Sequence, residues 1–178
     1  MEILSKKNYL SKVKKLNIRY WNNSTEVRWN YMKDVINELN NIRPNSGIEI
    51  GTNMISLMDG SDSIALEIET VDPDNINNNN YIMDARNVPW NIENKKYDVF
   101  VGLQVFEHLS PNQSEIFKEI ERISKYCILT VPYMWDCPND IEHHMITDDI
   151  ISKWTLGYKP YRKSINSGRL MICFKFNG

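Results

Sequence analysis

The middle of the chain reads Tyr97-Asp98-Val99-Phe100-Val101-Gly102, a short apolar run of the kind that forms a buried strand. A helical pattern follows over 113–124, and a second apolar run covers 127–131 before Pro132 stops it. This strand–helix–strand order is typical of parallel neighbours in one sheet. The apolar face of the helix consists of Ile116, Phe117, Ile120 and Ile123.

The same alternation extends toward the amino terminus. Short strands are predicted over 47–51, 64–71 and 81–83. An amphipathic helix precedes them from Glu26, because apolar residues recur every three or four positions until the polar turn 44–47. These apolar residues are Trp29, Met32, Val35, Ile36, Leu39 and Ile42.

Toward the carboxyl terminus, Thr147 is predicted to cap a helix that runs through Trp154. Two strands are predicted between Arg162 and Phe176, around the turn 166–168. Together these patterns predict an α/β fold with a mainly parallel sheet, helices on both faces and an antiparallel element at one edge. Ligands of such sheets bind at the carboxyl ends of the strands.

Acidic residues stand at or beside three predicted strand ends. Glu49 lies beside Gly51, whose missing side chain lets the backbone approach a ligand closely. Asp72 ends the second strand, where a carboxylate can accept from both ribose hydroxyls. Asp84 ends the third strand, where it can accept from an adenine amino group while the Ala85 N–H donates to the ring. The order predicts an adenosine-type ligand, although any one of these acids could serve only for solvation.

Three segments resemble class I S-adenosylmethionine-dependent methyltransferases. The segment 84–90, Asp-Ala-Arg-Asn-Val-Pro-Trp, resembles their D-A-x-x-L-P-F motif, and 97–109 is similar to their F-D-x-V…x-V-L-E-H-L segment. The segment 119–132 matches a helix and the fifth strand of small members, so that the resemblance covers roughly 47–176. It implies a Rossmann-like seven-stranded fold with an antiparallel last strand, and S-adenosylmethionine as the methyl donor. The implied donor-binding residues are Glu49, Gly51, Thr52, Asp72, Asp84, Ala85, Leu103 and Gln104.

The first turn departs from this family. The family pattern E/D-x-G-x-G-x-G is replaced by Glu-Ile-Gly-Thr-Asn-Met-Ile at 49–55, which keeps only the first glycine. The stretch 56–63 also looks too broken for a full helix. The methionine end of the donor is therefore expected to be held differently or weakly. A catalytically degenerate binding or scaffold protein is the alternative that this turn favours.

The histidines His108, His143 and His144 are the candidate catalytic residues. A neutral imidazole suits removal of a proton from an attacking hydroxyl, while the alternative is that one of the pair 143–144 orders its loop. Glu142, His143, His144 and Asp148 could together form a metal set, but adjacent loop histidines rarely bind one ion together, and no metal is predicted. Tyr133 and Trp135 are the candidate substrate-binding residues, with plain core packing as the alternative.

The pattern V-P-Y-x-W…H-H…D…W-T…P over 131–160 resembles small methyltransferases of sugar and surface-polysaccharide modification. The predicted function is therefore methyl transfer to a hydroxyl of a small molecule, such as a sugar or nucleotide-linked sugar. Residues 1–43 carry nine Lys or Arg against four acids, which raises a nucleic-acid methyltransferase as a further alternative. The absence of an N-P-P-Y segment and the formal net charge of −2 disfavour it.

The length of 178 residues suits one domain with a short appendage. We expect a basic arm, solvated and partly mobile, and an amphipathic helix over 1–43, and a methyltransferase domain over 44–178. No apolar run approaches the roughly 20 residues of a membrane span, and the first residues lack a secretory pattern, which predicts a cytoplasmic protein without a membrane partner. The three widely spaced cysteines predict reduced thiols. The oligomeric state stays open, a homo-oligomer included.

Overall fold

A computed structural model describes residues 1–52, 54–65 and 80–177. Its central sheet has seven strands in the order β5-β4-β2-β6-β7-β9-β8. The first five strands in that order are parallel, whereas β9 runs antiparallel to both of its neighbours. The strands are β2 (Gly47–Ile50), β4 (Asp62–Ala65), β5 (Asn80–Ile82), β6 (Tyr97–Leu103), β7 (Ser124–Pro132), β8 (Arg162–Asn166) and β9 (Arg169–Lys175).

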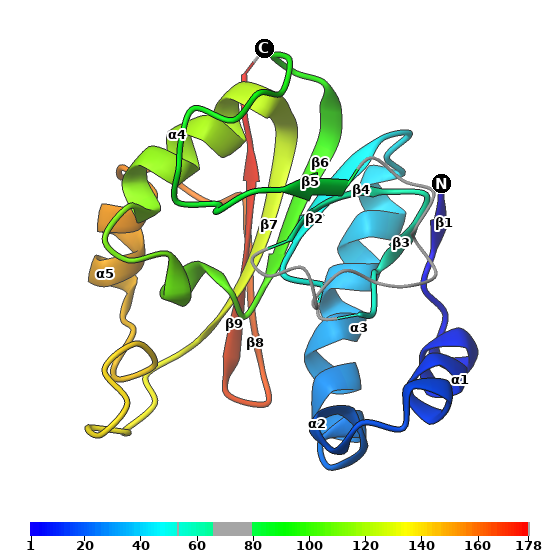
Figure 1. The fold of residues 1–178 in the computed structure, drawn as a ribbon. Coiled ribbons are helices and arrows are strands. Elements are labelled where there is room, and N and C mark those ends of the chain that lie inside the picture. Colours follow the sequence, from blue (N-terminus) through cyan, green and yellow to red (C-terminus); the bar gives the residue numbers. More distant parts are fainter. Residues whose placement is uncertain (53, 66–79, 178) are drawn as a thin grey trace.

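Helices cover both faces of this sheet (Figure 1). One face carries α1 (Lys6–Leu16), α2 (Arg19–Asn22) and α3 (Thr25–Ile42), and the other carries η3 (Phe106–Leu109), α4 (Gln113–Ile123) and α5 (Asp148–Trp154). Successive residues of a strand point to opposite faces, so each strand supplies both layers. In β6, Val99 and Val101 pack toward α3, whereas Phe100 packs toward α4. The predicted α/β fold with a mostly parallel sheet is confirmed.

Individual elements follow their local signals closely. The Thr147 side chain caps α5 by accepting from the Ile150 N–H, as predicted. The 56–63 stretch forms no helix: β3 (Met58–Asp59) pairs antiparallel with β1 (Glu2–Ile3), and a turn leads on into β4. The predicted strand 64–71 is seen only as the end of β4, because 66–79 lies outside the described residues.

The amino-terminal segment differs from the expected solvated arm. Residues 6–16 and 19–22 are helical, and Tyr9, Val13 and Trp21 are buried in the same core cluster as α3 and the sheet. The ring of Tyr9 stacks on that of Trp29 with centroids 5.4 Å apart. The physical reason is that burial of these large side chains outweighs the cost of ordering a lysine-rich helix, whose lysines can stay at the solvent side.

The structure also describes the cysteines and the length of the helices. The three cysteines carry no disulfide, and Cys127 and Cys173 are buried in β7 and β9. Across the ranges that the structure describes, no helix is both long and apolar enough to cross a membrane.

Candidate functional site

A small cavity lies at the carboxyl ends of β2 and β6, where ligands of parallel sheets bind. It encloses about 30 Å³, whereas ligand pockets usually offer roughly 300 Å³ or more. Five residues predicted to hold the methyl donor line it: Glu49, Gly51, Thr52, Leu103 and Gln104. The remaining lining residues come largely from the amino-terminal helices and are Tyr20, Trp21, Arg28, Tyr31, Met32, Ile50, Ile55 and Val101.

The backbone turns sharply at both strand ends beside this cavity. Gly51 has a φ of 64°, a left-handed conformation that glycine adopts without the clash of a Cβ atom. Gln104 follows β6 with a φ of 52°, and its Nε2 donates to the Thr130 Oγ1 over 3.2 Å. The sole surviving glycine of the first turn therefore stands where a side chain would be strained.

Glu49 is occupied by the protein itself. Its buried carboxylate accepts from the N–H groups of Leu57 and Met58 and from the hydroxyls of Ser56 and Ser61. Burial raises the pKa of Glu49, and these hydrogen bonds oppose that rise. The side chain thus holds the 56–61 segment against β2, and a direct contact with a ligand would have to replace one of these bonds.

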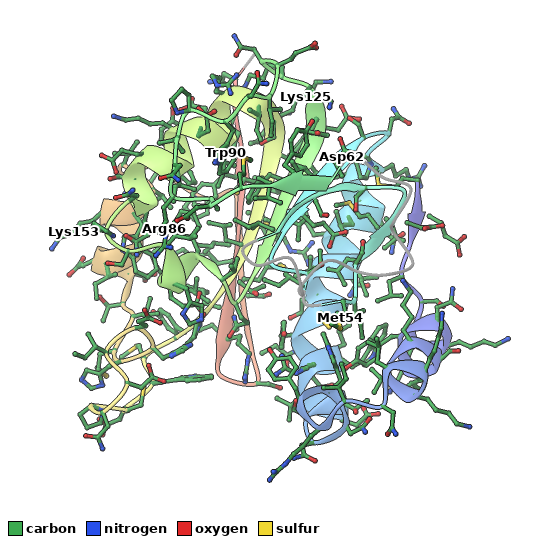
Figure 2. All side chains as sticks on the ribbon, viewed as in Figure 1. Met54, Asp62, Arg86, Trp90, Lys125 and Lys153 are labelled. Carbon is green, nitrogen blue, oxygen red and sulfur yellow. The ribbon has the colours of Figure 1, made fainter. Side chains whose placement is uncertain are left out.

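The predicted adenine-side residues follow β5. The Asp84 carboxylate accepts from the Arg86 guanidinium at 2.9 Å and from the Arg86 N–H at 2.9 Å, and these bonds lower the pKa of Asp84. Ala85 is fully buried, and its carbonyl accepts from the Trp90 indole N–H over 3.1 Å. Arg86 and Trp90 lie on the α4 side of the sheet, and Met54 lies on the α3 side (Figure 2). Asp72 lies outside the described residues.

Two of the candidate histidines come together beyond β6. His108 lies in η3, directly after β6, and His143 lies in the loop after β7; their ring centroids are 4.8 Å apart. The Nδ1 atom of His108 is 2.6 Å from the Glu142 Oε2, and that of His143 is 2.7 Å from the Asp140 Oδ1. A carboxylate can only accept here, so each imidazole carries its proton on Nδ1 when neutral and leaves the Nε2 lone pair open.

Glu107 lies next to His108 and His143 and forms a cluster with them. Its side chain is buried, and neither of its oxygens has a hydrogen-bond partner among the described residues. Burial, with a contribution from the nearby Glu142 charge, raises the pKa of Glu107 to about 8. Its Oε1 is 3.9 Å from the His143 Nε2, which is too long for a hydrogen bond. One potential ligand atom from each of Glu107, His108 and His143 lies within 4.8 Å of the others.

His144 has a different place. Its Nδ1 accepts from the Cys137 N–H over 3.1 Å, so this histidine orders the loop rather than joining the pair. The alternative metal set of Glu142, His143, His144 and Asp148 is not assembled: Asp148 instead pairs with Lys163 at 2.7 Å. Among the residues searched, the potential metal ligands that converge are Glu107, His108 and His143.

An arginine links the histidine cluster to the cavity. The guanidinium carbon of Arg169 lies 5.3 Å from the centre of the Tyr31 ring, which lines the cavity, and 4.8 Å from that of Trp135. Trp135 in turn stacks on His143. Tyr133, the other predicted substrate-binding residue, is partly buried against the α4-side core. The structure therefore brings Trp135, but not the ring of Tyr133, into a described contact with the cluster.

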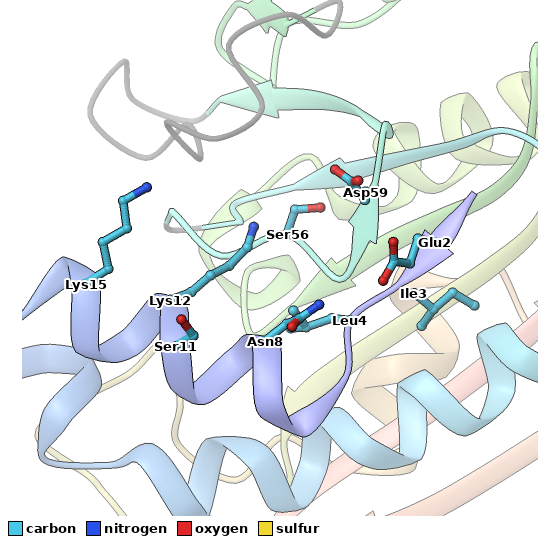
Figure 3. Close-up of a pocket in the computed structure, with 9 residues that line it drawn as sticks. All are labelled: Glu2, Ile3, Leu4, Asn8, Ser11, Lys12, Lys15, Ser56 and Asp59. Carbon is cyan, nitrogen blue, oxygen red and sulfur yellow. The ribbon is translucent and has the colours of Figure 1, made fainter.

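A second and larger cavity, of about 340 Å³, lies between α1 and the β1–β3 pair (Figure 3). Its lining mixes cations such as Lys12 and Lys15 with the carboxylates of Glu2 and Asp59. It touches the first turn only through Ser56, which binds Glu49. Its lining includes neither residues at the carboxyl ends of the parallel strands nor histidines, so we do not assign it to the candidate site.

Glu107 and Arg169 were not predicted from the sequence. Glu107 directly precedes His108 in the stretch that resembles the family, and this adjacency was its only local signal. Arg169 opens β9, 60 residues after the end of η3 at Leu109, and nothing in its neighbourhood along the chain indicates a contact with a ring at the site.

The comparisons with known proteins concern the fold. No protein-family model matches the sequence, and no curated protein matches it either. A SAM dependent methyltransferase from Aquifex aeolicus superposes with a TM-score of 0.60 at 14% identity, covering 92% of this chain and 96% of that one. An S-adenosylmethionine-dependent methyltransferase from Clostridium acetobutylicum gives 0.62 at 9% identity, covering 81% and 89%, and the PH0226 protein from Pyrococcus horikoshii gives 0.66 at 12%, covering 90% and 93%. The chain thus has the mostly parallel, Rossmann-like fold of S-adenosylmethionine-dependent methyltransferases.

Proposed function

We propose that this protein is an S-adenosylmethionine-dependent methyltransferase that methylates a hydroxyl of a small molecule. The observation that carries the proposal is that five predicted donor-binding residues line one cavity at the carboxyl ends of β2 and β6, and that the Glu107-His108 pair follows three residues beyond Gln104. Ligand sites of this fold class occupy the same edge.

The residues fit the donor in part. Gly51 offers a backbone that a ligand can approach closely, and Asp84 offers a carboxylate that is 38% exposed at its side chain. The cavity of about 30 Å³ is too small for a ligand of this size, so the side chains from α2 and α3 would have to move on binding. Gly51, Thr52, Leu103 and Gln104 would hold the methionine portion, and Asp84 with Ala85 the nucleoside.

S-adenosylmethionine would supply a methyl group on a sulfonium, which the acceptor oxygen takes while the sulfonium becomes a thioether. The protein would contribute mainly alignment of the acceptor. An imidazole Nε2 of His143 or His108 is suitably open to take the hydroxyl proton. Trp135 offers a partly exposed aromatic ring beside His143, against which the C–H groups of a sugar ring would pack. We propose a sugar or nucleotide-linked sugar as the acceptor on this ground and on the resemblance.

The test is calorimetric titration of the full chain with S-adenosylmethionine and S-adenosylhomocysteine. We expect micromolar binding to the wild type, and a loss of about ten- to a hundredfold in Asp84→Asn, which is the scale of a hydrogen bond to a charged group. Asp149→Asn, an exposed aspartate in the first turn of α5, is the matched control and should bind as the wild type does.

A scaffold protein is the second candidate. Two observations favour it: the cavity is small, and the carboxylates of Glu49 and Asp84 are both engaged by protein donors. This candidate predicts no binding of either nucleoside ligand at millimolar concentration, which would sink the methyltransferase proposal.

A further inference from the structure

Glu107 is a buried acidic residue whose carboxyl group is not satisfied by the residues that the structure describes. Its side chain is fully buried, and both carboxylate oxygens are without a hydrogen bond in the part of the chain that is described. Burying a carboxylate without partners is costly, and native proteins almost always pair such groups or bind a cation with them. An ionised Glu107 therefore calls for a positive charge at this point.

The neighbouring imidazoles are oriented as metal ligands are. His108 and His143 each place Nδ1 against a carboxylate, Glu142 and Asp140 respectively, at 2.6 and 2.7 Å. A carboxylate behind one ring nitrogen fixes the tautomer and makes the other nitrogen a better donor to a cation. The rings approach edge to face, with 76° between their planes.

We propose that Glu107, His108 and His143 bind one divalent first-row transition-metal cation. Ligands about 2.0–2.2 Å from such an ion lie roughly 3–4 Å from one another. The cluster, with its ligand atoms within 4.8 Å and the Glu107–His143 pair at 3.9 Å, needs only small side-chain movements to reach this geometry.

The donor set decides the class of ion. Two imidazole nitrogens and one carboxylate suit manganese, iron, cobalt or zinc, whereas magnesium and calcium prefer oxygen ligands throughout. Three protein ligands also leave coordination positions open, which is typical of sites that bind a substrate rather than of structural sites. His108 and His143 are 37% and 23% exposed at their side chains, so an acceptor could reach the ion from solvent.

The role of the cation rests on the proposed function. A hydroxyl bound to the cation becomes more acidic and releases its proton to water more readily. The two imidazoles would then be ligands instead of proton acceptors. Arg169 and Trp135 connect this position to the cavity through Tyr31, so the cation would hold the acceptor beside the cavity proposed for the methionine portion of the donor.

The experiment uses the full chain, freed of metal with a chelator and titrated with MnCl2, ZnCl2 and MgCl2. Binding is followed by calorimetry and, for manganese, by the loss of the free-ion electron paramagnetic resonance signal. We expect one manganese or zinc ion per chain and at least tenfold weaker binding of magnesium. Glu107→Gln and His143→Ala should each weaken manganese binding by about a hundredfold or more. Glu115→Gln, a change to an exposed glutamate in the first turn of α4, is the matched control and should bind manganese as the wild type does.

A merely structural role is separated by thermal unfolding. Glu107→Gln replaces a buried carboxyl group with an amide of nearly the same shape, so without metal it should melt at the same temperature as the wild type or higher. Manganese should raise the melting temperature of the wild type and not that of this variant. Unchanged manganese affinity in both Glu107→Gln and His143→Ala, or no binding of any transition metal to the wild type, would overturn the site.

The same chelator-treated protein is titrated with S-adenosylhomocysteine. Binding of that ligand without metal binding would refute the cation site and leave the proposed function standing. Metal binding without S-adenosylhomocysteine binding would support the cation site and refute the proposed function.

Discussion

The indole ring of Trp135 stacks on the imidazole ring of His143, with centroids 6.2 Å apart and only 22° between the planes. The indole N–H donates to the Gly168 carbonyl over 2.7 Å, so the tip of the β8–β9 hairpin holds the ring in place. Gly168 can approach this closely because a Cβ atom there would lie 2.9 Å from the indole nitrogen. The hairpin therefore positions one side of the proposed acceptor site.

Trp135→Ala should impair the handling of the acceptor and leave the methyl donor unaffected. Loss of the stacked ring removes a wall beside His143, and we expect the KM for the acceptor to rise about tenfold, the effect of roughly 1.4 kcal/mol. Trp135→Phe keeps an aromatic face and should recover most of this loss. Steady-state kinetics with each acceptor found by screening makes the measurement, and calorimetry with S-adenosylhomocysteine makes the comparison. A parallel fall in donor affinity would contradict the assignment of Trp135 to the acceptor side.

Gly51→Ala tests the first turn against a matched glycine. Both Gly51 and Gly60 have positive φ angles, 64° and 78°, so alanine at either position should cost about 1–2 kcal/mol of stability. Gly51 lines the strand-end cavity, whereas a Cβ on Gly60 meets nothing within 4 Å. We expect Gly51→Ala to weaken S-adenosylhomocysteine binding at least tenfold and Gly60→Ala to leave it unchanged. Urea unfolding of both variants measures the cost of backbone strain in stability, and calorimetry measures the effect on S-adenosylhomocysteine binding.

Many elements of the fold can be predicted from the sequence, because the patterns that indicate them are local. The apolar runs of β6 and β7, the Thr147 cap and the hairpin around 166–168 each depend on residues a few positions apart, and each element forms where predicted. Helices α1 and α2 were not predicted, for the opposite reason. Tyr9 and Trp21 are buried by partners from α3, and no regular period marks that face in advance.

The histidine cluster shows the same limit at the site. His108 and Glu142 lie 34 positions apart, and their contact depends on the path of the loop after β7. The two adjacent histidines are equivalent in the sequence. In the structure, however, His143 lies beside Glu107, whereas His144 accepts a hydrogen bond from the Cys137 N–H. The burial of Glu107 likewise results from tertiary packing, since an acid next to a histidine in a polar-looking segment usually faces solvent.

Asp98→Asn should destabilise the protein in a pH-dependent way. The bond from Lys125, with the Asn45 and Ser46 N–H groups, lowers the pKa of Asp98 below its usual range. A carboxyl with a lowered folded-state pKa contributes stability that is present above the unfolded pKa of about 4 and is lost as the pH falls through the lower, folded value. We expect the variant to lose about 1–2 kcal/mol at pH 7.

Urea unfolding of both proteins at pH 7, 5 and 3 checks this expectation. The difference between them should be the same at pH 7 and 5 and should narrow at pH 3. Lys125→Met is the control, because it keeps the two backbone donors and should cost less than Asp98→Asn at pH 7. A difference that stays constant down to pH 3 would show that the charge of Asp98 is not what stabilises the start of β6.

Arg28 is expected to control entry to the strand-end cavity. Its guanidinium carbon lies 3.7 Å from the centre of the Tyr20 ring and 5.1 Å from that of Trp21, and its Nε donates to the Ser24 Oγ over 2.8 Å. These contacts tie α2 and α3 together over the cavity, which encloses only about 30 Å³. If binding must first separate them, Arg28→Ala should raise the association rate of S-adenosylhomocysteine severalfold, because the open form becomes more populated.

Stopped-flow tryptophan fluorescence measures this rate directly, since Trp21 lines the cavity. Lys33→Ala, an exposed position on the same helix, is the matched control and should leave the rate unchanged. Because Arg28 also lines the cavity, its removal can weaken the complex through the dissociation rate while still speeding association. Only a slower or unchanged association rate would therefore contradict the idea that α2 covers the site, whatever happens to the affinity.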